Sequence, residues 1–226
     1  MKLVLLRHGQ STYNLEKKFC GWTDVPLTQK GILEAKQAGI ILKNNNFKFD
    51  VAYTSVLKRA KDTLKYVLEE LNADIKVYED WHLNERCYGA LQGKTHKEMI
   101  NKYGSKQVHI YRRSYDVKPP SLSKEDIRYA GNDIIYKGLK NLPLTESLED
   151  TLKRTVYYFN SVIKPNIKQG KNILIVAHGN SLRSLVKYLE NLTSEEIVNF
   201  EFETGIPYVY EIDENMNIFN KYFLRG

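Results

Sequence analysis

Two histidines in this sequence each follow a short run of apolar residues. His8 comes after residues 2–6, and His178 comes after residues 173–177. Each run predicts a buried strand, so each histidine lies at the carboxyl end of a strand, where open α/β sheets bind ligands. A neutral imidazole can attack a phosphoryl group and hold it as phosphohistidine, which splits one displacement into two steps. The histidine pair therefore predicts chemistry on an anion, and on a phosphate in particular.

Arginines and a carboxylate near the same predicted strands complete this chemistry. Phosphoryl transfer depends mainly on positioning and on positive charge at the equatorial oxygens. Arg7 adjoins His8, and Arg59 lies in the first turns of the helix predicted after residues 54–55. A guanidinium binds two phosphate oxygens through its planar fork. Glu85, just after the third predicted strand, is the candidate general acid and base, and Arg86 beside it can hold it in place.

Each of these residues also has a simpler structural interpretation. A single histidine is more often structural than catalytic, and Arg59 or Glu85 alone is most often a solvated charge or a surface ion pair. The functional interpretation depends on the conjunction, because all of them fall at one edge of one predicted sheet. Gly179 and Asn180 are further candidates at this edge, since they follow His178 into a predicted helix whose backbone amides can approach an anion.

The elements that must position these residues alternate between strand and helix. Apolar side chains recur at helical spacing in residues 28–44, 56–71, 147–163 and 181–189, and further strands are predicted at residues 50–54 and 75–78. A terminal hairpin is predicted from residues 208–212 and 218–223. Such alternation favours parallel βαβ units. We therefore predict a single domain over residues 1–226: a three-layer α/β/α sandwich around a mostly parallel sheet with an antiparallel edge.

Residues 94–144 interrupt this alternation. The segment begins with a short helix-like stretch and otherwise shows little sustained periodicity. It carries the adjacent arginines Arg112 and Arg113 and contains Pro119 and Pro120. Long irregular stretches in compact domains are usually lids or binding loops. We therefore predict an irregular lid excursion that places Arg112 and Arg113 over a phosphate site.

The composition bounds the partners and the setting. The formal net charge is +7, with basic residues dispersed among acidic ones, which is typical of a lysine-rich surface and would also steer a small polyanion. No nucleic-acid motif accompanies the charge, and no apolar run approaches the roughly 20 residues of a membrane span. Cys20 and Cys87 have no metal-ligand spacing, and no signal peptide precedes the first strand. We expect a cytoplasmic protein without a nucleic-acid or membrane partner.

Eight collinear stretches resemble the cofactor-dependent phosphoglycerate mutases of the histidine phosphatase superfamily. They span nearly the whole chain, at residues 6–14, 21–24, 53–60, 83–86, 88–93, 111–114, 143–148 and 177–183. The opening Arg-His-Gly marks only the superfamily. The Glu-Arg-x-Tyr-Gly-Ala-Leu-Gln-Gly, Arg-Arg and Thr-Glu-Ser-Leu segments are similar to the mutase branch in particular.

The resemblance implies an isomerase that interconverts 3-phosphoglycerate and 2-phosphoglycerate in glycolysis and gluconeogenesis. 2,3-Bisphosphoglycerate would be the intermediate and the primer that phosphorylates His8, with no metal needed. Glu85 would serve as acid and base, and the phosphoryl group would be surrounded by Arg7, Ser11, Asn14, Gly21, Arg59, His178 and Asn180. The rest of the substrate would be held by Tyr88, Arg112 and Arg113, with Arg86 and Gly179 beside them. A homodimer or a homotetramer is also implied, and the sequence does not decide between them.

Three departures from the family pattern keep a second function open. Cys20 stands where Thr is usual, Cys87 replaces a His, and His96 falls where a substrate-contacting Lys is expected. Many relatives also carry a longer C-terminal tail over the site, and a missing cover would admit water to the phosphohistidine. The alternative is therefore a histidine phosphatase that hydrolyses small phosphate esters on the same scaffold. A non-catalytic phosphate-binding protein is a third interpretation, which the retention of both histidines and Glu85 disfavours.

Overall fold

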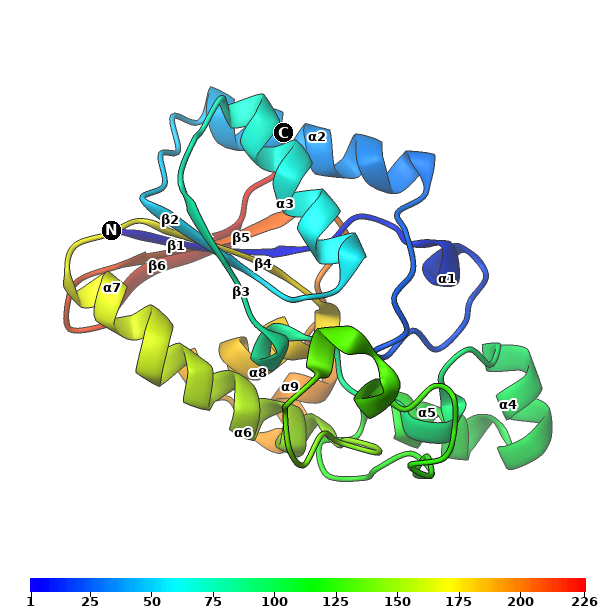
Figure 1. Cartoon of the computed structure of the whole chain (residues 1–226). Helices are drawn as coiled ribbons and strands as arrows, with labels where there is room; N and C mark the ends of the chain where they lie inside the picture. The colour runs from blue at the N-terminus through cyan, green and yellow to red at the C-terminus, as the bar shows by residue number, and fades with distance from the viewer.

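One sheet carries both histidines. The computed structural model describes all 226 residues, and its six strands form one sheet in the order β3-β2-β4-β1-β5-β6 (Figure 1). The strands are β1 (Lys2–Arg7), β2 (Val51–Thr54), β3 (Lys76–Glu79), β4 (Ile173–Ala177), β5 (Pro207–Ile212) and β6 (Ile218–Phe223). Strands β1 to β4 are parallel, whereas β5 pairs antiparallel with β1 and with β6. The predicted mostly parallel sheet with an antiparallel edge is confirmed.

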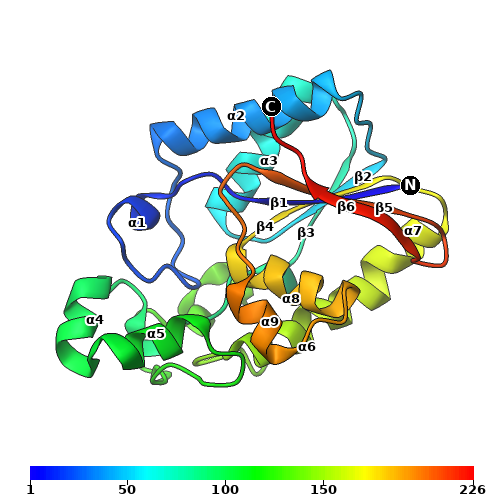
Figure 2. The ribbon, with the colours of Figure 1, turned by 180° about the vertical axis from the view of Figure 1, so that it is seen from behind.

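Helices cover both faces of the sheet. One face carries α2 (Gln29–Asn44) and α3 (Lys58–Leu71), and the other carries α6 (Leu148–Tyr158), α7 (Lys164–Lys168), α8 (Gly179–Leu189) and α9 (Ser194–Asn199) (Figures 1 and 2). A π-helical turn, Phe159–Ile163, joins α6 to α7 just before Pro165, whose ring disfavours regular α-helical hydrogen bonding. None of the helices has the length and apolar character that crossing a membrane requires. The three-layer α/β/α sandwich is confirmed.

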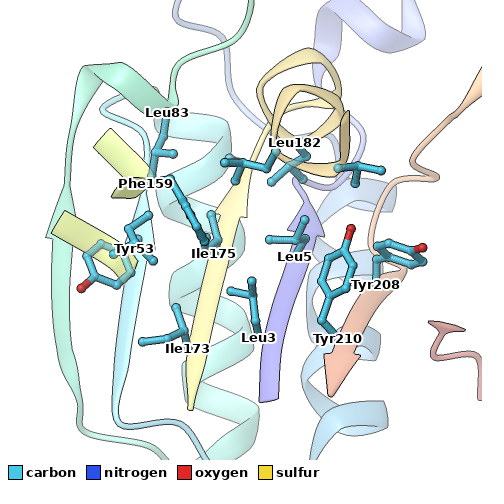
Figure 3. Close-up of a cluster of buried hydrophobic side chains, with 14 of the residues drawn as sticks. Leu3, Leu5, Tyr53, Leu83, Phe159, Ile173, Ile175, Leu182, Tyr208 and Tyr210 are labelled. Carbon is cyan, nitrogen blue, oxygen red and sulfur yellow. The ribbon is translucent and has the colours of Figure 1, made fainter. Parts of the chain in front are cut away.

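Alternate residues of β1 and β4 face opposite helix layers. One set packs with α6 and α8 in a cluster of 21 buried residues that includes Leu3, Leu5, Ile173 and Ile175 (Figure 3). The other packs with α2 and α3 in a cluster of 14 that includes Val4, Leu6, Leu174 and Val176. Because side chains alternate between the faces of a strand, an uninterrupted apolar run fits a strand that is buried on both faces. Two layers of core therefore fix the strands whose ends carry His8 and His178.

The excursion between β3 and α6 is more regular than predicted. It contains α4 (His96–Tyr103), α5 (Ser105–Arg113) and 3₁₀ turns at Trp81–Leu83, Gly89–Leu91, Ala130–Asn132 and Ile134–Tyr136. Helix α4 begins with a capping box, in which Thr95 Oγ1 accepts the Glu98 N–H and the Glu98 carboxylate accepts the Thr95 N–H. The prediction of an irregular segment is therefore correct only for residues after Arg113. Helix α1 (Thr12–Leu15), too short for a periodic signal, is a further addition.

Gly9 and Gly31 set how closely the loop after His8 approaches α2. A Cβ on Gly31 would lie 2.1 Å from the Gln10 carbonyl oxygen, and one on Gly9 would lie 2.1 Å from the Gly31 carbonyl oxygen. Gly31→Ala is therefore expected to displace this loop and to lower the free energy of unfolding in urea by roughly 1–3 kcal/mol. Lys30→Ala at an exposed neighbouring position is the control, with an expected change below about 0.5 kcal/mol. Equal effects of the two substitutions would contradict this packing argument.

Candidate active site

His8 and His178 meet at the carboxyl edge of the sheet. Strands β1 and β4 are parallel neighbours with Arg7 opposite Ala177, so the next residue on each strand is a histidine at the same level. The two ring centroids are 5.0 Å apart, at an interplanar angle of 62°. His8 is 2% exposed and His178 is fully buried. The structure thus brings the two strand-end histidines together as one unit.

The surroundings of His8 leave one ring nitrogen free to act as a nucleophile. Nδ1 lies 2.7 Å from the Gly9 carbonyl oxygen, and because a carbonyl oxygen only accepts, Nδ1 carries the proton. The lone pair is then on Nε2. Burial, followed by the positive charges of Arg59 and Arg7, lowers the pKa of His8 well below its usual value. The ring is therefore neutral near pH 7, as attack on phosphorus requires.

Ser55 orients His178. Its Oγ lies 2.7 Å from Nε2 of His178, and the same oxygen accepts the Leu57 N–H at 3.2 Å. Burial, and next the charge of Arg59, lowers the pKa of His178 well below its usual value. Ser55 was not predicted from the sequence, because a serine after a strand gives no sign of the side chain that it will contact at the end of the neighbouring strand. The contact holds the His178 ring in place beside His8.

Unpaired arginines surround the two histidines. Of the nine arginines in the chain, those with a carboxylate partner are Arg113, Arg128, Arg154 and Arg225. The others, which all lie in or beside the site, are Arg7, Arg59, Arg86, Arg112 and Arg183. Buried Nε atoms without any hydrogen-bond partner occur in Arg7, Arg59, Arg86 and Arg183. Because an unpaired buried charge is costly, this site is suited to receive an anion.

Arg59 reaches the histidines from the first turn of α3. Its Nη1 and Nη2 atoms donate to the carbonyl oxygens of Thr23, at 3.0 Å, and Gly21, at 2.8 Å. Gly21 has a φ of +54°, and a Cβ there would lie 2.0 Å from the Gln92 side chain. The role of Gly21 in the structure is therefore to present its carbonyl group to Arg59, which leaves the Nε edge of the guanidinium unpartnered.

Glu85 faces the site from a segment that is held at its backbone. Its Oε1 atom accepts the N–H groups of Arg86, at 2.8 Å, and Asn180, at 3.1 Å. Its carbonyl oxygen accepts Nε1–H of Trp22, at 2.5 Å, and Nη2–H of Arg154, at 2.9 Å. The side chain is buried apart from 8% exposure. Oε2 has no such partner and is free to exchange a proton with a bound molecule.

A cleft of about 330 Å³ opens beside these groups, and Arg7 and Glu85 are among the residues that line it. Its cationic lining side chains are Arg7, Lys17, Lys18, Arg112, Arg113 and Arg183, and its acidic ones are Glu85 and Glu201. The predicted residues Asn14, Tyr88, Gly179 and Asn180 also line it. Within it, Lys18 pairs with Glu16 and Arg113 pairs with Glu201. The excess of positive charge indicates a ligand with several negative charges.

Six of the predicted residues do not line the cleft, namely His8, Ser11, Gly21, Arg59, Arg86 and His178. Ser11 and Arg86 support residues that do line it. Ser11 caps α1, where its Oγ accepts the Asn14 N–H at 3.3 Å. Arg86 donates from Nη2 to the carbonyl oxygens of Tyr111 and Arg112, each at 2.9 Å. Arg86 therefore holds the end of α5, which carries Arg112 and Arg113.

Sequence analysis missed Lys17, Lys18, Arg183 and Glu201. Arg183 could have been found, because it lies three residues after Asn180 on one helix face, and its Nη1 donates to Asn180 Oδ1 at 3.0 Å. Lys17 and Lys18 follow the end of α1, and Glu201 follows the end of α9. They reach the cleft only because these ends lie near the excursion, which no local sequence pattern shows. These residues add three cations and one carboxylate to the predicted lining.

This site holds neither a cluster of metal-ligating side chains nor a reactive thiol. No group of three His, Cys, Asp or Glu side chains is placed to hold a metal ion. Burial raises the pKa of Cys20, which lines the cleft, and raises that of Cys87 to about 12. Because the thiolate is the reactive form, both side chains behave as protonated, weakly reactive thiols.

The fold and the site define a class of protein. Residues 3–224 match the family model of the histidine phosphatase superfamily (branch 1), and the chain belongs to this superfamily. Its members act on phosphate groups, in agreement with the geometry around His8.

Solved structures share the fold over nearly the whole chain. The alpha-ribazole phosphatase from Shigella flexneri is 22% identical, with a TM-score of 0.70, and the match covers 100% of this chain and 95% of that one. A mycobacterial glucosyl-3-phosphoglycerate phosphatase is 19% identical, with a TM-score of 0.73, over 98% of this chain and 96% of that one. The Bacillus stearothermophilus protein YhfR is 24% identical, with a TM-score of 0.72, over 94% and 91%. At these identities the similarity establishes the fold.

Ser55→Ala is expected to slow phosphorylation of His8 by roughly 10- to 100-fold, because a small displacement of a group at the reacting centre has an effect of this order. The measurement is the rate at which acid-labile phosphoenzyme forms after mixing with a phosphate donor. Ser161→Ala is the control, since Ser161 only bonds the Tyr157 carbonyl at an exposed position, and it should leave the rate unchanged. An unaltered rate in Ser55→Ala would mean that packing alone orients His178.

Proposed function

We propose that this chain is a 2,3-bisphosphoglycerate-dependent phosphoglycerate mutase, which interconverts 3-phosphoglycerate and 2-phosphoglycerate in glycolysis and gluconeogenesis. The observation that carries the proposal is the extent of unpaired positive charge, from Arg7 and Arg59 beside His8 to Arg112 at the end of α5. One phosphate group carries only about −1.5 to −2 charges at pH 7. Phosphoglycerate adds a carboxylate at a distance from its phosphate. A small molecule with anionic groups at both ends therefore fits this cleft better than a simple phosphate ester.

The residues around His8 can carry out both phosphoryl transfers. Nε2 of His8 attacks phosphorus, while Arg7 and Arg59 neutralise the charge that spreads over the equatorial oxygens. Glu85 gives a proton to the substrate oxygen that leaves phosphorus. In the reverse direction it takes the proton from a substrate hydroxyl as the hydroxyl oxygen attacks the phosphohistidine. In the primed enzyme, the free hydroxyl of the bound phosphoglycerate attacks phosphohistidine 8, which frees the imidazole and forms 2,3-bisphosphoglycerate. His8 then takes the other phosphoryl group, which leaves the isomeric phosphoglycerate and restores the phosphoenzyme.

The same cleft fits the primer. Arg7 and Arg183 line it with buried, unpartnered Nε atoms, which suit a phosphate or carboxylate oxygen. Arg112 would hold the end of the molecule that is distant from His8. When bound, 2,3-bisphosphoglycerate supplies the phosphoryl group that loads His8. The proposed chemistry requires no metal ion.

A hydrolase on the same scaffold is the second candidate. Four of the solved structures that resemble this chain are of an alpha-ribazole phosphatase or a glucosyl-3-phosphoglycerate phosphatase. This similarity favours a histidine phosphatase acting on small phosphate esters over the mutase. Such an enzyme would use the same groups around His8 but would pass the phosphoryl group to water. It would not depend on a bisphosphate primer, and this difference separates the two functions experimentally.

Conversion of 3-phosphoglycerate to 2-phosphoglycerate by the purified protein tests the proposal. The reaction is run with and without 2,3-bisphosphoglycerate, and released phosphate is counted in parallel. We expect isomerisation that requires the primer and little release of phosphate. Release of phosphate without isomerisation would instead identify the hydrolase.

A further inference from the structure

His96 lies in the wall of the cleft with both ring nitrogens free. It is the first residue of α4, is half-buried, and lines the cleft together with Lys17 and Arg112. Its ring packs edge-on against Phe19, with centroids 4.8 Å apart at 70°. No hydrogen bond to the ring supports either protonation state, since only burial and nearby charges act on it. The ring is therefore fixed by an apolar contact, while its polar edge is available to a ligand.

The charged groups that act most strongly on His96 are both positive. Lys17 comes from the loop after α1, where its carbonyl oxygen accepts the His96 N–H at 2.9 Å, and Arg112 comes from α5. The nearby carboxylates have other partners. Glu98 accepts the Thr95 N–H at the start of the same helix. Glu16 pairs with Lys18, and Glu201 pairs with Arg113. The amino terminus of α4 adds a further positive potential, and Lys97 follows on the same turn.

This environment keeps His96 uncharged in the empty cleft. Burial, followed by the charges of Arg112 and Lys17, lowers the pKa of His96 to about 4. A polyanion among these three side chains would reverse the balance, because its charge would offset the repulsion from Arg112 and Lys17 and would favour the imidazolium. The empty cleft thus has a neutral imidazole at a position where a cationic side chain would bind an anionic ligand more tightly.

We propose that His96 takes up a proton from solvent when a phosphoglycerate enters the cleft, and that the imidazolium so formed contacts the anionic group distant from His8. The proton returns to solvent when the ligand leaves, so no other reactant is needed. The inference rests on the proposed function, because it assumes a ligand with two anionic ends. It makes His96 a specificity-determining residue that couples binding to pH.

The sign of this coupling follows from linkage. In the ligand-free protein the pKa of His96 is about 4, and below that pH His96 is charged with or without ligand. Between this pKa and the higher pKa of His96 in the complex, ligand binding is accompanied by uptake of a proton. The dissociation constant therefore rises with pH by up to about tenfold per pH unit. Above the second value His96 is neutral in both states and has no further effect.

Calorimetric titration of the unprimed protein with 3-phosphoglycerate tests the inference. Wild type, His96→Gln and His96→Lys are compared from about pH 5.5 to 7.5 in two buffers of different ionisation enthalpy, which gives the number of protons bound. The second ionisation of the phosphate, near pH 6, is common to all three proteins and cancels in the comparison. Thermal unfolding of each variant verifies that it is folded.

We expect wild type to take up more protons on binding than either variant, by up to about one per molecule bound. His96→Lys should bind more tightly than wild type as pH rises, and His96→Gln should approach the wild-type affinity at the high end. Equal proton counts in wild type and His96→Gln, with measurable binding, would overturn this inference and leave the proposed function standing. Absence of binding by wild type would overturn both.

Discussion

His8→Asn is expected to abolish the acid-labile phosphoenzyme and to reduce turnover of phosphoglycerate by roughly 10⁴-fold or more, since loss of a covalent nucleophile has effects of this size. The expectation rests on the tautomer that the structure fixes. Nδ1 of His8 donates to Gly9, so Nε2 holds the lone pair, and the lowered pKa keeps it available near pH 7. An asparagine amide has no comparable lone pair on nitrogen, so it cannot take the phosphoryl group.

The measurement is incorporation of radioactive phosphate from a labelled donor, followed by turnover under the same conditions. His109→Asn is the matched control, because His109 is exposed on α5 and lines no part of the cleft; it should retain both activities. Turnover in His8→Asn close to wild type would require a different nucleophile and would contradict the mechanism.

Arg154→Met is expected to lower the free energy of unfolding by about 3–5 kcal/mol, the cost of breaking a buried ion pair. Arg154 binds both carboxylate oxygens of Glu146, at 2.7 and 2.9 Å, and the two side chains are only 8% and 4% exposed. Methionine fills a similar volume but leaves the Glu146 charge buried without its partner. The substitution also removes the donors to the carbonyl oxygens of His82, Asn84 and Glu85.

The measurement is the urea denaturation midpoint, with activity recorded on the fraction that remains folded. Arg225→Met is the control, because its pair with Glu203 is exposed on both sides, and surface pairs contribute about 0–1 kcal/mol. We also expect Arg154→Met to lose activity while folded, since Arg154 supports the backbone of Glu85. A similar midpoint for the two variants would show that Glu146 is neutralised without cost.

The sheet and the histidine pair could be predicted because their signals are local. The apolar runs before His8 and His178 are long enough to specify strands, and parallel strands end at the same edge of a sheet. Arg59 and Glu85 followed, because each lies just after a predicted strand. Only one short helix-like segment was predicted where the structure has α4 and α5, even though Thr95 and Glu98 form a readable capping box.

The supporting residues could not be predicted, because their roles depend on contacts between distant segments. Ser55 and His178 are 123 residues apart in sequence, and Arg154 and Glu85 are 69 apart. The bonds from Arg86 Nη2 to the backbone of α5 were not predicted, and its role in binding substrate stays a prediction. Neither composition nor periodicity distinguishes an arginine that binds a ligand from one that binds a carbonyl group.

The pairing of β1 with β4 has a consequence for how this protein could diversify. The 5.0 Å between the two histidine rings is close to the roughly 4.8 Å between adjacent strands. The spacing of the reactive pair therefore follows the backbone ladder, and the ring of His178 is held at that spacing by Ser55, which also lies at a strand end. The lid helices belong to a separate stretch of chain, so residues 96–113 could be exchanged without altering that spacing. Such an architecture allows new substrates to be explored while the chemistry of phosphoryl transfer is kept intact.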